Sequence, residues 1–228
     1  MPFEQAVYIV DDDPGILKSM RWLLESAHLR VHTFSSGASF LECYNADDPG
    51  CLILDMRMPG ITGLDVQKRL AQMGAQLPII VMTAHADVPV CIESFKSGVF
   101  DFIEKPADDD LLLERIRKAL LVDEENRKRK ASRNDFAERA ATLSPRERQV
   151  MHLVIAGKNL KQIALELGVG VQTAAKHRAG MFEKLGLDND VQLVRLTGQF
   201  DLASAAKPLP PAACVSLPEC GQPGSQIA

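Results

Sequence analysis

The chain has 228 residues, 46% of them hydrophobic, which is enough to build one large core or two modest ones. Residues 1–121 carry 18 acidic and 11 basic side chains (net −7), whereas residues 122–228 carry 12 and 15 (net +3), so we expect an acidic domain followed by a basic one. The sequence has no apolar run near the roughly 18 residues of a membrane span, no basic-then-apolar leader and no C-x-x-C pair among its five cysteines, which argues against a membrane-bound, exported or zinc-binding protein and predicts a cytoplasmic one.

Five short runs rich in β-branched residues lie within residues 1–121, and segments of helical period separate them. This alternation predicts a doubly wound, flavodoxin-like α/β domain with a five-stranded parallel sheet. The second run is half polar, as expected of an edge strand. Gly98 stands where a left-handed residue would end the fourth helix. The expected strands are Val7–Val10, Val31–Phe34, Cys51–Leu54, Ile79–Met82 and Phe100–Ile103, and the expected fourth helix carries Val88, Ile92 and Phe95.

Polar side chains follow the predicted strands at their carboxyl ends, which is where ligands bind in an open parallel sheet. Crowded carboxylates repel one another unless a cation joins them, and an all-oxygen ligand set suits Mg²⁺ or Mn²⁺. Beside such a metal, Asp55 could attack a phosphoryl group in line while Lys105 pairs with one of its oxygens, giving an aspartyl phosphate. The strand ends supply Asp11, Asp12, Asp13, Asp55, Thr83 and Lys105.

Each of these residues also has an ordinary structural interpretation. Asp13 stands directly before Pro14, where it could simply cap the first helix. Thr83 alone would be a strand residue, and Lys105 alone a surface charge. Their joint occurrence at the ends of four different strands favours a functional site over a set of unrelated residues.

Residues 5–120 resemble the receiver domain of response regulators, and the run MTAHADVPVCIESFKSGVFDFIEKP is similar to the FixJ branch in particular. The resemblance assigns a role to every residue at the strand ends except Asp13, and it adds three more positions. The implied roles are Asp55 as phospho-acceptor; Asp11, Asp12, Asp55 and the backbone carbonyl of Arg57 as metal ligands; Thr83, Phe102 and Lys105 as switch and phosphate-contacting residues; and Pro106 after a cis peptide bond.

The stretch at 122–141 is strongly charged and predicts a solvated helical linker, although its cluster Arg127–Lys130 could instead contact phosphates. Beyond the block at 142–203, residues 204–228 hold five prolines and little periodicity, so we expect a disordered tail. The predicted divisions are therefore a receiver at 1–121, a linker at 122–141, a DNA-binding domain at 142–203 and a tail at 204–228.

The block at 142–203 reads as all-α throughout. Ser144 and Glu147 form a capping box at the start of its first helix, and Gly157 ends that helix. A short second helix leads to a glycine turn at 168–170, and a third helix follows at 171–185. A helix-turn-helix motif inserts its second helix into the DNA major groove, so this order predicts that the helix at 171–185 contacts DNA. A three-helix bundle that binds protein is the alternative.

Residues 143–185 resemble the LuxR-type helix-turn-helix over its full length. Two positions depart from the family: Gly170 stands where Ser or Thr usually caps the recognition helix, and Ala174 stands where a branched residue usually packs. These changes predict a weaker cap and a smaller core contact. Ala175 and Ala179 offer only apolar contact, which leaves Lys176 as the main polar reader, so we expect affinity to rest on phosphates and dimerisation and to be sensitive to salt. The resemblance implies DNA contacts at Lys161, Gln172, Thr173, Ala175, Lys176, Arg178 and Ala179, and dimerisation through Val191, Val194 and Leu196.

The sequence thus predicts a two-component response regulator of the FixJ/NarL family. Such a protein would regulate transcription in response to phosphorylation and would catalyse only its own phosphoryl transfer and dephosphorylation. The expected partners are a cognate sensor histidine kinase, promoter DNA, RNA polymerase and, after phosphorylation, a second copy of the chain, with no membrane involved. Phosphate on Asp55 would draw Thr83 toward it, and Phe102 would turn inward to fill the vacated space.

Two alternatives remain open at this point. An aspartate-nucleophile, Mg²⁺-dependent phosphatase would also use a strand-end Asp and a Lys, but it would usually carry a metal-binding acid two residues after the nucleophile, where this chain has Arg57. A regulator whose receiver no longer depends on phosphate is the other, and the intact acidic site argues against it.

Overall fold

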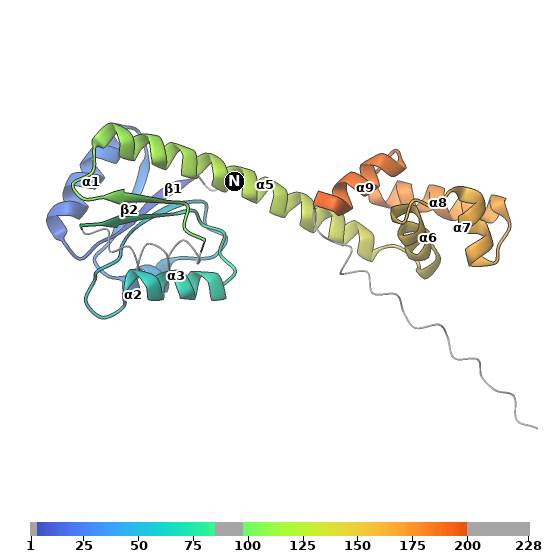
Figure 1. Cartoon of the computed structure of the whole chain (residues 1–228), viewed down its shortest axis with the longest axis horizontal. Coiled ribbons are helices and arrows are strands. Elements are labelled where there is room, and N and C mark those ends of the chain that lie inside the picture. The colour runs from blue at the N-terminus through green and yellow to red at the C-terminus, as the bar shows by residue number, and fades with distance from the viewer. Residues whose placement is uncertain (1–3, 85–97, 200–228) are drawn as a thin grey trace, which may run out of the picture. The chain divides into compact units, whose positions relative to one another are not determined.

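Figure 1 shows the computed structural model of the chain, which describes residues 4–84 and 98–199. These residues divide by their internal contacts into two compact units, one up to Asn134 and one from Asp135 onward. No helix within the described ranges is both long and apolar enough to cross a membrane. The predicted fourth helix of the first domain and the predicted tail lie outside the described residues.

The first unit is built on a five-stranded sheet in the order β2-β1-β3-β4-β5, in which all neighbouring strands run parallel. This confirms the predicted doubly wound α/β fold. The strand order reverses between β1 and β3, so the carboxyl ends of these two strands flank the crevice where ligands bind. The edge strand β2 is only partly buried, as predicted. The strands are β1 (Ala6–Val10), β2 (Arg30–Phe34), β3 (Gly50–Asp55), β4 (Ile79–Thr83) and β5 (Asp101–Glu104).

Helices cover both faces of the sheet (Figure 1) and enclose two apolar cores. Successive residues of a strand point to opposite faces, so Val7 packs in the core beneath α1 and α5, and Tyr8 packs in the core beneath α2 and α3. Helix α5 continues through the stretch 122–141. The described helices of this unit are α1 (Pro14–Ser26), α2 (Gly37–Cys43), α3 (Gly63–Gln72) and most of α5 (Asp109–Ala141).

Both ends of α1 are closed by hydrogen bonds. At its start, the Asp13 carboxylate accepts hydrogen bonds from the backbone N–H groups of Gly15 and Ile16, which confirms the capping interpretation of Asp13. At its end, His28 has a φ of 61°, and its N–H donates to the Glu25 carbonyl. A residue in this left-handed position is normally glycine, because a Cβ atom clashes with the neighbouring carbonyl.

Replacing His28 with Gly is expected to stabilise the first domain by about 0.5–1 kcal/mol. The left-handed conformation costs a residue with a Cβ roughly 1–2 kcal/mol, and glycine avoids this cost. Part of the gain in stability is lost again because glycine has more conformational freedom in the unfolded chain. Urea unfolding measures the difference. His28→Ala is the matched control, because it also removes the imidazole but keeps the Cβ. Equal stability of the Gly and Ala variants would contradict the prediction.

Up to Gln199, where its described residues end, the second unit is all-helical and consists of the last turns of α5 and four further helices. Its core gathers Phe136 of α5, Val150 and Ile163 of the next two helices, and Met181 and Leu193 of the last two. The predicted capping box of Ser144 and Glu147 is present, which confirms the predicted start of the first helix. The helices are α6 (Pro145–Ile155), α7 (Leu160–Leu167), α8 (Val171–Leu185) and α9 (Asp190–Gln199).

Candidate functional site

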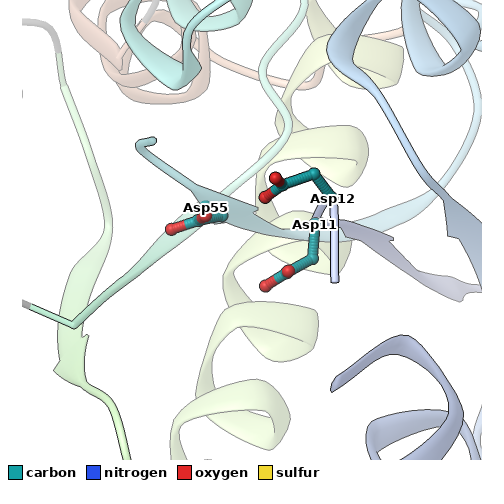
Figure 2. A group of neighbouring side chains, drawn as sticks. All are labelled: Asp11, Asp12 and Asp55. Carbon is teal, nitrogen blue, oxygen red and sulfur yellow. The ribbon is translucent and has the colours of Figure 1, made fainter. Parts of the chain in front are cut away.

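Three carboxylates meet where β1 and β3 end. Asp11 and Asp12 follow β1 directly, and Asp55 is the last residue of β3. One carboxylate oxygen from each lies within 4.8 Å of the others, and Figure 2 shows the three side chains gathered at this edge of the sheet. Asp11 and Asp55 are buried, whereas Asp12 is exposed. The parallel pairing of β1 with β3 brings the residues together, because it aligns the carboxyl ends of the two strands.

An ammonium group joins two of these carboxylates. The Lys105 Nζ atom lies 2.6 Å from Asp11 Oδ2 and 3.4 Å from Asp55 Oδ1. Lys105 directly follows β5, and its backbone N–H donates to the Thr83 carbonyl, which anchors it to the end of β4. The Lys105–Pro106 peptide is cis, as the resemblance implied. Four of the residues predicted at the strand ends therefore meet in one place.

The electrostatics of the site favour a further positive charge. Burial raises the pKa of Asp55, the Lys105 ammonium lowers it, and the negative charge of Asp11 raises it again, with a net shift above the ordinary value of a carboxyl group. Three carboxylates face one ammonium, and a divalent cation would offset the excess negative charge. Oxygen donors in this arrangement are those that Mg²⁺ or Mn²⁺ prefers. The donor set thus fits such an ion.

The other predicted receiver residues lie around this centre. Asp55 accepts a hydrogen bond from the Arg57 backbone, which places the Arg57 peptide beside the carboxylates. Thr83 is buried at the end of β4, the strand next to Asp55. Phe102 is half-buried in β5 and packs against the core on the α2 and α3 face. Their roles in phosphorylation stay predictions.

One residue that supports the site is not identifiable from the sequence. Gly63 begins α3 and lies against the backbone at the end of β3, with its N–H donating to the Met56 carbonyl. A Cβ at this position would lie 2.5 Å from the Asp55 carbonyl oxygen. The Thr62 capping box marks the start of the helix, but no sequence signal shows that the helix packs directly on Asp55.

In the second unit, α7 and α8 are joined by a tight turn in which Gly168 has a φ of 65°. Gly170 caps α8 without a side-chain hydrogen bond, and Ala174 is fully buried in the core of the unit. Several residues predicted to contact DNA share the exposed side of this motif. Lys161, Gln172, Thr173, Lys176 and Ala179 are exposed, and Ala175 is half-buried.

Arg178, a predicted phosphate contact, already has partners within the domain. Its Nη2 atom lies 2.8 Å from Asp190 Oδ1 at the start of α9, and its guanidinium lies 5.0 Å from the centre of the Phe182 ring. Of the residues predicted to dimerise, Val191 and Val194 are exposed, whereas Leu196 packs partly against the core of its own domain. These assignments to DNA and dimer contacts stay predictions.

Glu147 connects α6 to α8. Its carboxylate accepts hydrogen bonds from the Ser144 backbone N–H at 2.8 Å and from Lys184 Nζ at 2.7 Å. Gly180 allows this approach, because a Cβ there would lie 2.8 Å from Glu147 Oε1. The hydrogen bond from Lys184 and those from Ser144 lower the pKa of Glu147 to about 2.

Replacing Glu147 with Gln is expected to destabilise the second domain by about 1.5–3 kcal/mol at neutral pH, the range for hydrogen bonds to a charged group. Because folding lowers the Glu147 pKa, its ionised form stabilises the domain at neutral pH, and this stabilisation is lost as the pH falls from the ordinary range of a carboxyl group toward about 2. Urea unfolding at several pH values measures both effects. Glu166→Gln, which breaks the more exposed pair with Lys158, is the control and should cost less than about 1 kcal/mol. Similar losses in the two variants would contradict the role of Glu147.

Each of the two units matches a known protein family. Residues 7–117 match the response regulator receiver domain, and residues 141–197 match the bacterial regulatory proteins of the luxR family. The chain is 39% identical over 196 residues to the transcriptional regulatory protein FixJ of Azorhizobium caulinodans, covering 86% of this chain and 93% of that protein. It is also 39% identical to the response regulator protein TmoT of Ectopseudomonas mendocina, covering 85% and 88%.

Solved structures of response regulators are also similar to this chain. The response regulator StyR matches with a TM-score of 0.74 at 36% identity, covering 86% of this chain and 99% of that chain. Full-length FixJ from B. japonicum matches with a TM-score of 0.53 at 38% identity, covering 87% and 98%. Both comparisons span the two units of the chain.

Proposed function

The chain belongs to the response regulators that join a receiver domain to a LuxR-type helix-turn-helix domain, and from this premise we propose that phosphorylation of Asp55 controls its binding to promoter DNA. It is a phosphorylation-dependent transcriptional regulator, with a histidine kinase as its partner and DNA as its ligand. The single observation that carries the assignment of Asp55 is the meeting of Asp11, Asp12, Asp55 and Lys105 at the switch point of the sheet.

In the proposed reaction, an Asp55 oxygen attacks the phosphorus of a phosphohistidine or a small acyl phosphate. The new O–P bond forms as the bond to the leaving group breaks, and Asp55 becomes an aspartyl phosphate. Lys105 pairs with a phosphoryl oxygen. Asp11, Asp12, Asp55 and the Arg57 carbonyl would hold Mg²⁺ or Mn²⁺, which supplies charge neutralisation for the transferring group when it is bound. The receiver's own catalysis of phosphorylation and dephosphorylation is part of this proposal.

The output in this proposal begins with Thr83 and Phe102. Thr83 ends the strand beside Asp55, so its hydroxyl can move toward a phosphate there, and the half-buried ring of Phe102 can turn into the space that Thr83 leaves. The resulting change in surface would favour a homodimer. Exposed Val191 and Val194 support a dimer contact through α9, with Leu196 holding that helix to its own core. Contact with RNA polymerase at the promoter completes the proposal.

DNA would be read by the exposed side of α8. Lys176 supplies the main polar contact to base edges, the small Ala175 and Ala179 leave room for thymine methyl groups, and Lys161 on α7 contacts phosphate. Arg178 can reach phosphate only by sharing or giving up Asp190. Few polar base readers and a recognition helix without a side-chain cap support strong dependence on phosphates and therefore on salt.

The test is DNA binding with and without beryllofluoride, a mimic of the aspartyl phosphate, measured by fluorescence anisotropy in Mg²⁺ on a fragment selected from the protein's own genome. We expect beryllofluoride to change the dissociation constant at least several-fold for the wild type and to have no effect on Asp55→Asn. Equal affinities for the wild type in both conditions would overturn the proposal. The phosphatase alternative is not supported, because both units match regulator domains.

A further inference from the structure

A buried carboxylate lies at the opposite end of the sheet from the phosphorylation site. Asp123 of α5 is only 2% exposed, although it belongs to the charged stretch that the sequence predicts to be solvated. Its Oδ2 atom accepts hydrogen bonds from the Gly50 N–H at 2.9 Å and from Gln5 Nε2 at 3.2 Å. The Arg127 Nε atom donates to both of its oxygens, at 3.1 and 3.0 Å. This charge is thus fully paired.

The chain geometry at Gly50 brings the backbone to Asp123. Gly50 has a φ of 146°, and a Cβ there would lie 1.8 Å from the Ala6 carbonyl oxygen. Only glycine allows β3 to begin so close to β1. Gln5, directly before β1, donates to Asp123 and also to the Leu120 carbonyl at 2.8 Å. Asp123 therefore joins α5 to the amino ends of both strands whose carboxyl ends carry Asp11 and Asp55.

The contacts continue one turn further along α5. Arg127 Nη1 donates to the Asp47 carbonyl oxygen at 2.6 Å, and Lys130 Nζ lies 2.7 Å from Asp47 Oδ1. The three α5 residues Asp123, Arg127 and Lys130 recur at helical spacing, so a single stripe of the helix faces the first unit. The Lys130 pair is exposed and adds little. Asp123 is buried although Arg127 is partly exposed, so removing Arg127 would leave the buried carboxylate without a charged partner, which is costly.

We propose that Asp123 is the positioning residue that fixes the linker part of α5 to the receiver and makes DNA binding respond to phosphorylation. A linker held at the ends of β1 and β3 moves with the strands that carry the phosphorylation site. A linker released from them would tether the two domains as independent bodies, and phosphorylation of one would then hardly change DNA binding by the other. The proposal rests on phosphorylation at Asp55 as the input.

The experiment uses the full chain with three variants. Asp123→Asn removes the charge but keeps an acceptor for Gly50. Asp123→Asn combined with Arg127→Gln replaces both charged groups by neutral amides, which avoids leaving Arg127 unpaired. Glu124→Gln is the matched control, since Glu124 is exposed and its ion pair among the described residues is with Lys128 of the same helix. Each variant is measured for thermal unfolding, for phosphorylation by acetyl phosphate, and for DNA affinity with and without beryllofluoride.

We expect the double variant to stay folded and to be phosphorylated like the wild type, while the ratio of its DNA affinities with and without beryllofluoride falls to within about twofold of one. A coupling of 5- to 150-fold is typical of such systems, so the loss is measurable. Glu124→Gln should keep the wild-type ratio. The proposal is overturned if the folded double variant keeps the affinity ratio of the wild type. It is also overturned if that variant is no longer phosphorylated, because Asp123 would then support the phosphorylation site itself. If the wild type itself shows equal DNA affinities with and without beryllofluoride, the proposed function is overturned instead.

Discussion

Replacing Asp55 with Asn is expected to abolish phosphorylation by acetyl phosphate and by a histidine kinase, because the amide has no oxygen nucleophile of comparable strength. Phosphate-affinity gel electrophoresis, which separates phosphorylated from unphosphorylated protein, measures the product. The matched control is Asp13→Asn, which changes a neighbouring acid in the same way but keeps an efficient helix cap at the start of α1. Undiminished phosphorylation of Asp55→Asn would exclude Asp55 as the acceptor.

Loss of phosphorylation in this variant should not come from unfolding. Since folding raises the pKa of Asp55, the ionised carboxylate destabilises the folded receiver at any pH above the ordinary range of a carboxyl group. Asparagine removes this cost, so we expect Asp55→Asn to melt at the wild-type temperature or higher when no divalent cation is added. A clearly lower melting temperature would show that the Asp55–Lys105 contact outweighs burial and repulsion.

Removing Mg²⁺ with a chelator is expected to slow phosphorylation by on the order of 100-fold or more, because a metal at such a site supplies several kcal/mol of charge stabilisation. Asp11→Asn should have a similar effect in saturating Mg²⁺.

Binding of Mg²⁺ can also be followed by its effect on stability. At one hundred times its dissociation constant, a bound ion adds about 2.7 kcal/mol to the free energy of unfolding. Asp11→Asn should lose this gain and Asp13→Asn should keep it. Unchanged rates and melting temperatures after chelation would exclude a functional metal.

Much of the receiver can be predicted from the sequence because its signals are local. Runs of β-branched residues mark the strands to within one residue, and the order of strands and helices requires a parallel sheet. The acids and the lysine then come together because each ends or follows a different strand of that sheet. Thus the meeting of Asp11, Asp55 and Lys105 follows from topology alone.

Contacts between distant segments have no such signal. Asp123 stands among charged residues in a helix, and nothing near it in the chain shows that Gln5 and Gly50 approach it. The sequence likewise presents Arg178 as a free cation beside the DNA-reading positions, but Asp190, twelve residues later, turns back to pair with it. Such pairings depend on how whole elements pack, and periodicity and spacing do not record them.

The hydrogen bond between Gly50 and Asp123 has a spectroscopic consequence. A backbone amide proton that is donated to a carboxylate resonates well downfield of ordinary amides, and its exchange with solvent is slowed as long as the bond persists. Glycine amides also form a distinct group in nitrogen-15 spectra. The Gly50 resonance therefore offers a native reporter that shows, in the intact protein and without any attached probe, whether the linker helix stays docked as the receiver passes between its unphosphorylated and phosphorylated forms.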